Sequence, residues 1–263
     1  MMLPFNNKPT MLREETVFGP IFSRRLGTSL GINLLPEKGK ICNFDCIYCE
    51  CGWNKDGRDD TVLPTAAKVR ADLENMLQHL LRQGVKVDSI TFSGDGEPTL
   101  NPEFPQIIDD TLALRDELAA GSKVSVLSNA TRVHLPEVFH ALQKVDNPIM
   151  KIDAPTNELV AKINHPTPGY DVARVVESLK QFKGNFILQT CMLRSKEYDF
   201  DSSRPEVLEG WKDIVRQLHP REIMVYTIDR PTPAQGLEKF TVEEMTALVQ
   251  PLIDEGFCIQ IKG

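Results

Sequence analysis

The chain has 263 residues, of which 41% are hydrophobic and 25% charged, and 30 Lys and Arg against 37 Asp and Glu give a formal net charge of -7. This length suits one large α/β domain or two small ones, and the composition is that of a globular protein rather than a disordered chain. The acidic balance disfavours a dedicated nucleic-acid binder without excluding a local basic groove. No apolar run approaches the ~18 residues of a transmembrane helix, so we expect no membrane association.

The first residues, up to Glu15, do not combine an apolar core with a small-residue cleavage site. We therefore expect no secretory signal, a cytoplasmic location and reduced cysteines. Residues 1–16 are predicted to form an N-terminal arm. No linker-like segment interrupts the remainder, so residues 17–263 are predicted to form a single domain.

Predicted strands and helices alternate along that domain. The first strand is expected near residues 29–34, and the first helix begins at Pro64 and ends before Gly84. Further strands are predicted at 87–92, 124–127, 149–152, 186–193, 223–228 and 257–261. The other helices are predicted at 105–119, 137–143, 157–163 and 171–182, from residue 203 onward, and after a capping box that pairs Thr241 with Glu244.

This alternation predicts right-handed βα units on a parallel sheet. About six or seven units fit a full or partial (β/α) barrel, and they also fit an open doubly wound sheet. In either architecture the active-site groups follow the carboxyl ends of the strands. Those positions include residues 42–51, 94–97, 128–129, 153 and 229–236, so we expect the chemically distinctive residues to gather there.

Cys42, Cys46 and Cys49 form a C-x3-C-x2-C pattern. Three thiolates on one short loop can ligate three irons of a [4Fe–4S] cluster and leave the fourth iron open to a substrate or cofactor. A zinc site is an alternative, but no second pair of cysteines or histidines completes it. A thioredoxin-like dithiol of Cys46 and Cys49 is another, but it leaves Cys42 unexplained.

The remaining cysteines have simpler interpretations. Cys51 follows Cys49 too closely to add a fourth bond to the same cluster, so it is interpreted as a free thiol of the loop. Cys191 and Cys258 occur in apolar strand patterns and are predicted to pack in the core.

With Tyr48 before the third cysteine, the triplet resembles that of the radical S-adenosylmethionine (radical SAM) superfamily. The resemblance implies an α/β fold, a partial (β/α)6 barrel of the TIM type, and one [4Fe–4S] cluster held by Cys42, Cys46 and Cys49. It also implies that the open iron chelates SAM and that one electron cleaves SAM to methionine and a 5′-deoxyadenosyl radical, which abstracts hydrogen from an unidentified substrate. The electron is expected from a flavodoxin or a ferredoxin.

A second segment extends this resemblance. Ser93-Gly94-Asp95-Gly96-Glu97-Pro98-Thr99 looks like the Gly-Gly-Glu segment of the family. By this likeness, Gly94 and Gly96 allow a close backbone approach to SAM, and Glu97 accepts a hydrogen bond from the SAM ammonium. A polar turn between strand and helix is the alternative reading of the same residues.

Other candidate SAM contacts follow neighbouring strands. Ser128 and Asn129 end one strand and Asp153 ends the next, and similar polar residues of the family contact SAM. Helix capping is the alternative role for all three. Tyr48 is expected to hold the adenine region.

The glycine-rich stretch that contains Arg24 and Arg25 is similar to a group of radical SAM proteins related to the tRNA wyosine-base synthases. Those enzymes carry a second cluster on upstream cysteines, and this chain has no cysteine before Cys42. Their pyruvate-binding lysine has no clear counterpart, because Lys38 and Lys40 are interpreted as solvated loop charges. Arg24 and Arg25 remain candidates for binding an anionic substrate or for bracing the loop.

Two further functions stay open. A glycyl-radical activase fits a short chain with one triplet, and a non-catalytic iron–sulfur module for electron transfer or structure would need no SAM. If a substrate is bound, small or macromolecular, its contacts are predicted at Tyr226, Asp229 and Arg230, which end the sixth strand. His165 is an additional candidate for the site, and Gln189 is a further candidate for a SAM contact.

Overall fold

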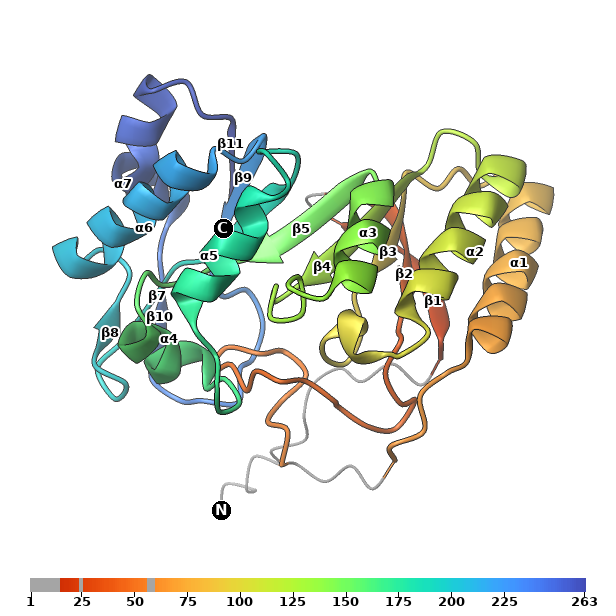
Figure 1. Ribbon diagram of the computed structural model, residues 1–263, viewed down its shortest axis with the longest axis horizontal. Coiled ribbons are helices and arrows are strands. Elements are labelled where there is room, and N and C mark those ends of the chain that lie inside the picture. Colours follow the sequence, from red (N-terminus) through yellow and green to blue (C-terminus); the bar gives the residue numbers. More distant parts are fainter. Residues whose placement is uncertain (1–14, 24–25, 56–59) are drawn as a thin grey trace, which may run out of the picture.

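The computed structural model describes residues 15–23, 26–55 and 60–263. Within these residues an eight-stranded sheet curls into a half-barrel (Figure 1), with the order β1-β2-β3-β4-β5-β6-β9-β11. Neighbouring strands are parallel throughout, except that β1 runs antiparallel to β2. The strands are β1 (Val17–Ser23), β2 (Gly27–Ile32), β3 (Ser89–Phe92), β4 (Lys123–Ser128), β5 (Asn147–Lys151), β6 (Ile187–Cys191), β9 (Glu222–Tyr226) and β11 (Ile259–Lys262).

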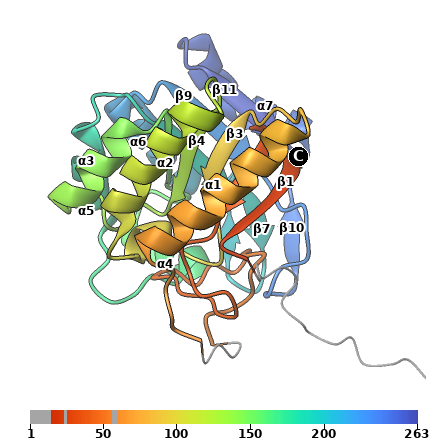
Figure 2. The ribbon, with the colours of Figure 1, turned by 90° about the vertical axis from the view of Figure 1, so that its right-hand side faces the viewer.

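Helices connect these parallel strands and lie along one face of the sheet (Figures 1 and 2). Six successive crossovers lead from β2 to β11, which confirms the predicted partial barrel of six βα units. The helices are α1 (Ala66–Arg82), α2 (Phe104–Leu118), α3 (Pro136–Lys144), α4 (Asn157–Asn164), α5 (Val172–Lys180), α6 (Pro205–Leu218) and α7 (Val242–Asp254). Among the described residues, none of the helices is both long and apolar enough to cross a membrane.

Local sequence explains where the helices begin. Thr65 precedes α1, and its hydroxyl accepts a hydrogen bond from the Lys68 amide at 3.3 Å. Thr241 and Glu244 form the predicted capping box of α7. The main hydrophobic core lies between the helices and the sheet, where Phe92 meets Phe104 edge to face at 6.3 Å.

The inner face of the half-barrel carries a ladder of polar side chains near the amino ends of the strands. Ser29 bonds Thr91 at 2.8 Å, and Ser89 bonds Ser125 at 3.0 Å. The Asn147 amide donates to Ser125 at 3.0 Å. These bonds tie β2 through β5 together, so the strand ends that carry the site residues are held in fixed relation.

The sequence missed two features of the sheet. Strand β1 extends the parallel sheet as an antiparallel edge, and a second, three-stranded sheet has the order β10-β7-β8. Its strands are β7 (Leu193–Ser195), β8 (Phe200–Asp201) and β10 (Leu237–Lys239). The predicted strand at 186–193 is therefore two strands, β6 and the start of β7, because the chain leaves the main sheet after Cys191.

The prediction for Cys258 was wrong, whereas Cys191 is buried as expected. Cys258 is exposed and precedes β11, which among the described strands is the last of the sheet and pairs only with β9. An edge position leaves side chains uncovered even where the sequence pattern is apolar.

Candidate functional site

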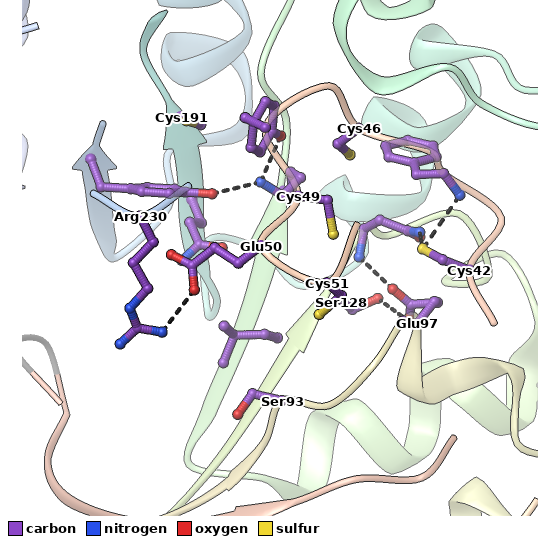
Figure 3. A pocket seen from close by; sticks show the side chains of 18 of the residues that line it. Cys42, Cys46, Cys49, Glu50, Cys51, Ser93, Glu97, Ser128, Cys191 and Arg230 are labelled. Carbon is purple, nitrogen blue, oxygen red and sulfur yellow. Dashed lines mark hydrogen bonds and ion pairs between the residues drawn. The ribbon is translucent and has the colours of Figure 1, made fainter. Parts of the chain in front are cut away.

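A cavity of about 290 Å³ lies at the carboxyl ends of the parallel strands. Figure 3 shows Cys42, Cys46 and Cys49 together on one side of this cavity, with the ion pair of Glu50 and Arg230 across from them. The predicted site residues that line it are Tyr48, Gly94, Gly96, Glu97, Ser128, Asn129, Tyr226, Asp229 and Arg230. The structure thus brings together most of the residues that sequence reasoning selected.

The loop that carries Cys42, Cys46 and Cys49, here called the cysteine loop, is fixed by backbone hydrogen bonds on both sides. Ile41 pairs with Gly96 as a parallel bridge, with the Ile41 amide donating to the Asp95 carbonyl at 3.1 Å. On the other side, the amide of Asp45 donates to the Asn164 carbonyl at 2.8 Å. The loop is therefore anchored to the end of β3 and to the end of α4.

Side chains also close the loop on itself. The Asn54 amide donates to the carbonyls of Cys42 and Phe44, each at 3.0 Å. Lys40 forms an ion pair with Asp45 at 3.3 Å and donates to the Gly52 carbonyl at 2.5 Å. The interpretation of Lys40 as a solvated charge was wrong, because its side chain is only 1% exposed. Packing of the loop over the cavity buries it.

Hydrogen-bond donors surround the sulfurs. The Phe44 amide lies 3.4 Å from the Cys42 sulfur, and the Asn164 side-chain amide lies 3.3 Å from the Cys46 sulfur. The side-chain amide of Asn129 lies 3.8 Å from the Cys42 sulfur. Such donors stabilise negative charge on sulfur, which is the state that binds iron.

The three thiols differ in acidity. Burial raises the pKa of Cys46 to about 11 and raises the pKa of Cys42 further. A hydrogen bond from the Cys51 thiol and the nearby Lys40 ammonium overcome burial at Cys49 and lower its pKa to about 6. Cys49 is therefore the thiol that ionises first, and Cys51 is its hydrogen-bond partner in the loop.

Glu97 links the ends of two strands. Its Oε1 accepts hydrogen bonds from Thr99 Oγ1 at 2.6 Å and Ser128 Oγ at 2.9 Å. Its Oε2 accepts one from the backbone amide of Asn129 at 2.7 Å. Burial raises the pKa of Glu97, while these hydrogen bonds oppose the rise. The carboxylate also lines the cavity, where its contact with the SAM ammonium stays a prediction.

The two glycines of this segment permit close contacts within the chain. Gly96 has a φ of +143°, and a Cβ there would lie 1.8 Å from the Ile41 carbonyl oxygen. A Cβ at Gly94 would lie 2.0 Å from the Asn33 side-chain oxygen. Glycine at 96 is thus needed to seat the cysteine loop beside β3, and glycine at 94 lets the end of β3 approach Asn33.

Tyr48 and Asp153 belong to a buried polar network. The Tyr48 hydroxyl donates to Asp153 and accepts a hydrogen bond from Lys151 Nζ at 3.0 Å. Lys151 also donates to the Tyr226 hydroxyl at 2.9 Å, and Asn164 donates to Asp153 at 2.8 Å. Tyr48, Lys151 and Tyr226 line the cavity, whereas the Asp153 side chain is fully buried behind them. Burial opposes ionisation of Lys151, but the charge of Asp153 outweighs it and raises the pKa of the ammonium.

The second wall of the cavity holds the candidate substrate residues. Arg230 pairs with Glu50 at 2.8 Å. Gln189 is only 5% exposed and lines the cavity, and no described residue bonds its side-chain amide. His165 lies apart from the cavity lining, exposed and stacked on Trp53 at 5.8 Å. The candidates Arg24 and Arg25 lie outside the described residues.

Sequence reasoning assigned no role to Lys151 or Asn164, and it misplaced Lys40. The one sequence signal for Lys151 was its position two residues before Asp153 at the end of a strand. That spacing puts both side chains on the same face of a strand. The amide of Asn164 is 118 residues from Cys46, so no local pattern could connect them.

The model of the radical SAM superfamily matches residues 37–199, more than half of the chain and the whole of the cysteine loop. The chain belongs to the radical SAM superfamily.

Two curated relatives cover nearly the whole chain. A UPF0026 protein of Helicobacter pylori is 28% identical over 250 residues, 93% of this chain and 75% of that protein. A protein named GTPase Obg, from Brachyspira hyodysenteriae, is 28% identical over 249 residues, also 93% of this chain. The chain spans only 34% of the length of that second relative.

Solved structures of radical SAM proteins share the fold. A radical SAM methyltransferase from Sphaerobacter thermophilus superposes with a TM-score of 0.65 at 16% identity, covering 89% of this chain and 65% of that chain. TYW1 with a lysine–pyruvate adduct bound superposes with a TM-score of 0.63 at 13% identity, covering 89% of this chain and 76% of that chain.

Membership of the radical SAM superfamily implies a [4Fe–4S] cluster and SAM, and the donor set suits such a cluster. Three thiols face one cavity, and donors approach their sulfurs from the chain. In the part of the chain that the structure describes, no three His, Cys, Asp or Glu side chains converge on a single metal position. Three thiols on one short loop are the donor type that binds three irons of a cubane, each thiolate on a different iron.

Proposed function

We propose that this radical SAM enzyme cleaves SAM reductively and uses the resulting radical to take hydrogen from a substrate held in the same cavity. The observation that carries the proposal is a cavity lined both by the three thiols and by polar residues of β5, β6 and β9. When bound, the reduced cluster supplies the electron that splits SAM into methionine and a 5′-deoxyadenosyl radical. A flavodoxin or ferredoxin is the proposed donor of that electron.

The chain supplies binding and orientation. Cys42, Cys46 and Cys49 are the proposed ligands of one [4Fe–4S] cluster. Glu97, already fixed by its hydrogen bonds, is the proposed acceptor for the SAM ammonium, and Asn129 is placed beside it. Because these groups are held by hydrogen bonds within the chain, we expect little reorganisation on binding.

The second wall is the proposed substrate side. Tyr226 is held by Lys151, and Asp229 and Arg230 follow it along the chain at the cavity. Gln189 lines the same space, and its side-chain amide, which no described residue bonds, offers both a donor and an acceptor. These residues are the proposed determinants of substrate choice, whether the substrate is a small molecule or part of a macromolecule.

The test is anaerobic. The protein is reconstituted with iron and sulfide, reduced with dithionite and given SAM, and 5′-deoxyadenosine is measured by chromatography. We expect product from the wild type and from Cys258→Ser, whose thiol is exposed, and none from Cys42→Ala, Cys46→Ala or Cys49→Ala.

Other outcomes identify the alternatives. An intact cluster without SAM binding would support a non-catalytic iron–sulfur module. SAM cleavage that required a partner protein, with a radical formed on that partner, would support a glycyl-radical activase. Modification of a tRNA guanosine in the presence of pyruvate would support a wyosine-type reaction, the chemistry of the group that the sequence resembles.

A further inference from the structure

Two lysines precede the cysteine triplet, and the structure gives them opposite surroundings. Lys38 is exposed, and its described hydrogen bond uses its backbone amide. Lys40 is buried and lines the cavity beside the cysteines. A lysine is rarely buried to this extent unless it is paired, because removing its charge from water is costly.

The partners of Lys40 hold its charge in place. Its ammonium reaches the Asp45 carboxylate at 3.3 Å and the Gly52 carbonyl at 2.5 Å, so it links two residues that stand before and after Cys46 and Cys49 in the loop. Cys42 and Cys49, the two ends of the triplet, line the same cavity as Lys40. The Asp45 side chain is 25% exposed, so water weakens the negative partner more than the buried ammonium.

We propose that Lys40 is an electrostatic positioning residue that raises the reduction potential of the cluster bound by Cys42, Cys46 and Cys49. This inference rests on the proposed cluster. Reduction adds one negative charge to the cluster and its thiolates, and a fixed positive charge nearby stabilises that reduced state. Net charge and surroundings are the properties that set the potentials of such clusters.

The sign of the effect separates this role from a structural one. Removal of the ammonium in Lys40→Met should lower the potential. Neutralisation of its partner in Asp45→Asn should raise it, because the lysine charge is then less compensated, while the amide oxygen still accepts the same hydrogen bonds. A residue that merely closed the loop would give no such opposite pair of shifts.

The experiment is a redox titration followed by electron paramagnetic resonance, made on the full chain after anaerobic reconstitution. At the wild-type midpoint, Lys40→Met should lower the ratio of reduced to oxidised cluster about tenfold, the effect of one unit charge at ~10 Å and an effective dielectric constant of ~20. For a one-electron couple this is about 59 mV. Lys40→Arg keeps the charge, and Lys38→Met removes an exposed one, so both should stay close to the wild type.

Unchanged potentials in Lys40→Met and Asp45→Asn would overturn the inference, as would shifts in the same direction. If Lys40→Met does not retain its cluster, the Asp45→Asn variant provides the test. A reduction potential of Asp45→Asn at or below that of the wild type would overturn the inference. A wild-type protein that assembles no cluster would instead refute the proposed function.

Discussion

The side-chain amide of Asn164 lies 3.3 Å from the Cys46 sulfur and 2.8 Å from an oxygen of Asp153. One residue at the end of α4 therefore connects the cysteine loop to the buried network behind the cavity. The hydrogen-bond partners of Asp153 also include the Cys191 backbone amide on β6, so the loop is coupled to the central strands through a few side chains.

Substitution of Asn164 by Ala should destabilise the protein by about 1–3 kcal/mol, because the buried Asp153 carboxylate loses a donor. The reconstituted variant should also lose iron faster than the wild type, since the Cys46 sulfur loses its amide donor. Urea denaturation and timed iron assays check both. His165→Asn, which changes the exposed neighbour, serves as the control. Wild-type stability and iron retention in Asn164→Ala would show that the amide is dispensable.

Glu97→Gln should cost about 1–3 kcal/mol of folding free energy, because the Gln carboxamide has one oxygen that accepts hydrogen bonds where the Glu carboxylate has two. The four hydrogen bonds to Glu97 come from Thr99, Ser128 and Asn129, and a Gln must turn an NH₂ group toward one of these donors. SAM affinity, measured by calorimetry on the reconstituted protein, should fall as well. Glu177→Gln is the control, because that side chain is 73% exposed. Full SAM affinity in Glu97→Gln would remove this residue from the proposed SAM site.

Gly96→Ala should destabilise the protein by about 3 kcal/mol or more and prevent stable cluster assembly. The added Cβ would overlap the Ile41 carbonyl oxygen and break the bridge that seats the cysteine loop. Gly84→Ala separates this clash from backbone strain, since Gly84 also has a positive φ but has nothing within 4 Å of the added atom. Its cost should be only about 1 kcal/mol. Equal losses in the two variants would argue against the close contact.

Gln189→Leu should leave the free energy of unfolding within about 0.5 kcal/mol of the wild type, because no described residue bonds the Gln189 amide. The adjacent Thr190 provides the contrast. Its hydroxyl donates to the Ile152 carbonyl at 2.7 Å and accepts from Trp211 at 2.9 Å, so Thr190→Val should cost about 1–3 kcal/mol. A comparable loss in Gln189→Leu would mean that the amide serves stability rather than substrate binding.

Asp146 should make stability depend on pH. Burial opposes its ionisation, but donors from Val124, Lys123 and Arg115 outweigh burial and lower its pKa. Its contribution is therefore fully present above its unfolded pKa of about 3.9 and is lost as the pH falls through the lower folded value. Asp146→Asn should be less stable than the wild type by about 1–3 kcal/mol at pH 7. The difference should shrink below about pH 4.

Denaturation at pH 7 and at pH 3 checks this prediction. Asp116→Asn is the matched control, because Asp116 also pairs with Arg115 but is 71% exposed. A stability difference that stays constant between the two pH values would contradict the assigned titration.

Regular patterns in the sequence predicted most of this fold. The order of βα units follows from hydrophobic periodicity and helix caps, and the thiols, glycines and Glu97 were recognisable because their spacing is local. Strand β1 was missed because it pairs antiparallel with β2, and the alternation of strand and helix does not predict such a strand. Strands β7 and β10 pair across about forty residues, which periodicity cannot detect.

Burial of single charged residues could not be predicted in the same way. Lys38 and Lys40 have nearly the same sequence context, yet one is exposed and the other buried. The difference depends on Asp45 and Gly52, which meet Lys40 only after the loop has turned back on itself. Lys151 is similar, because its partners Tyr48 and Tyr226 come from segments far apart in the chain.

The closure of the cysteine loop by Asn54, Lys40 and the end of α4 bears on how the protein matures. All of these bonds are made by the polypeptide itself, so they add to any bond that the thiols make to iron. Zinc fingers behave differently, because they remain unfolded until their metal binds. We therefore expect that removal of iron by a chelator would leave most of this fold in place.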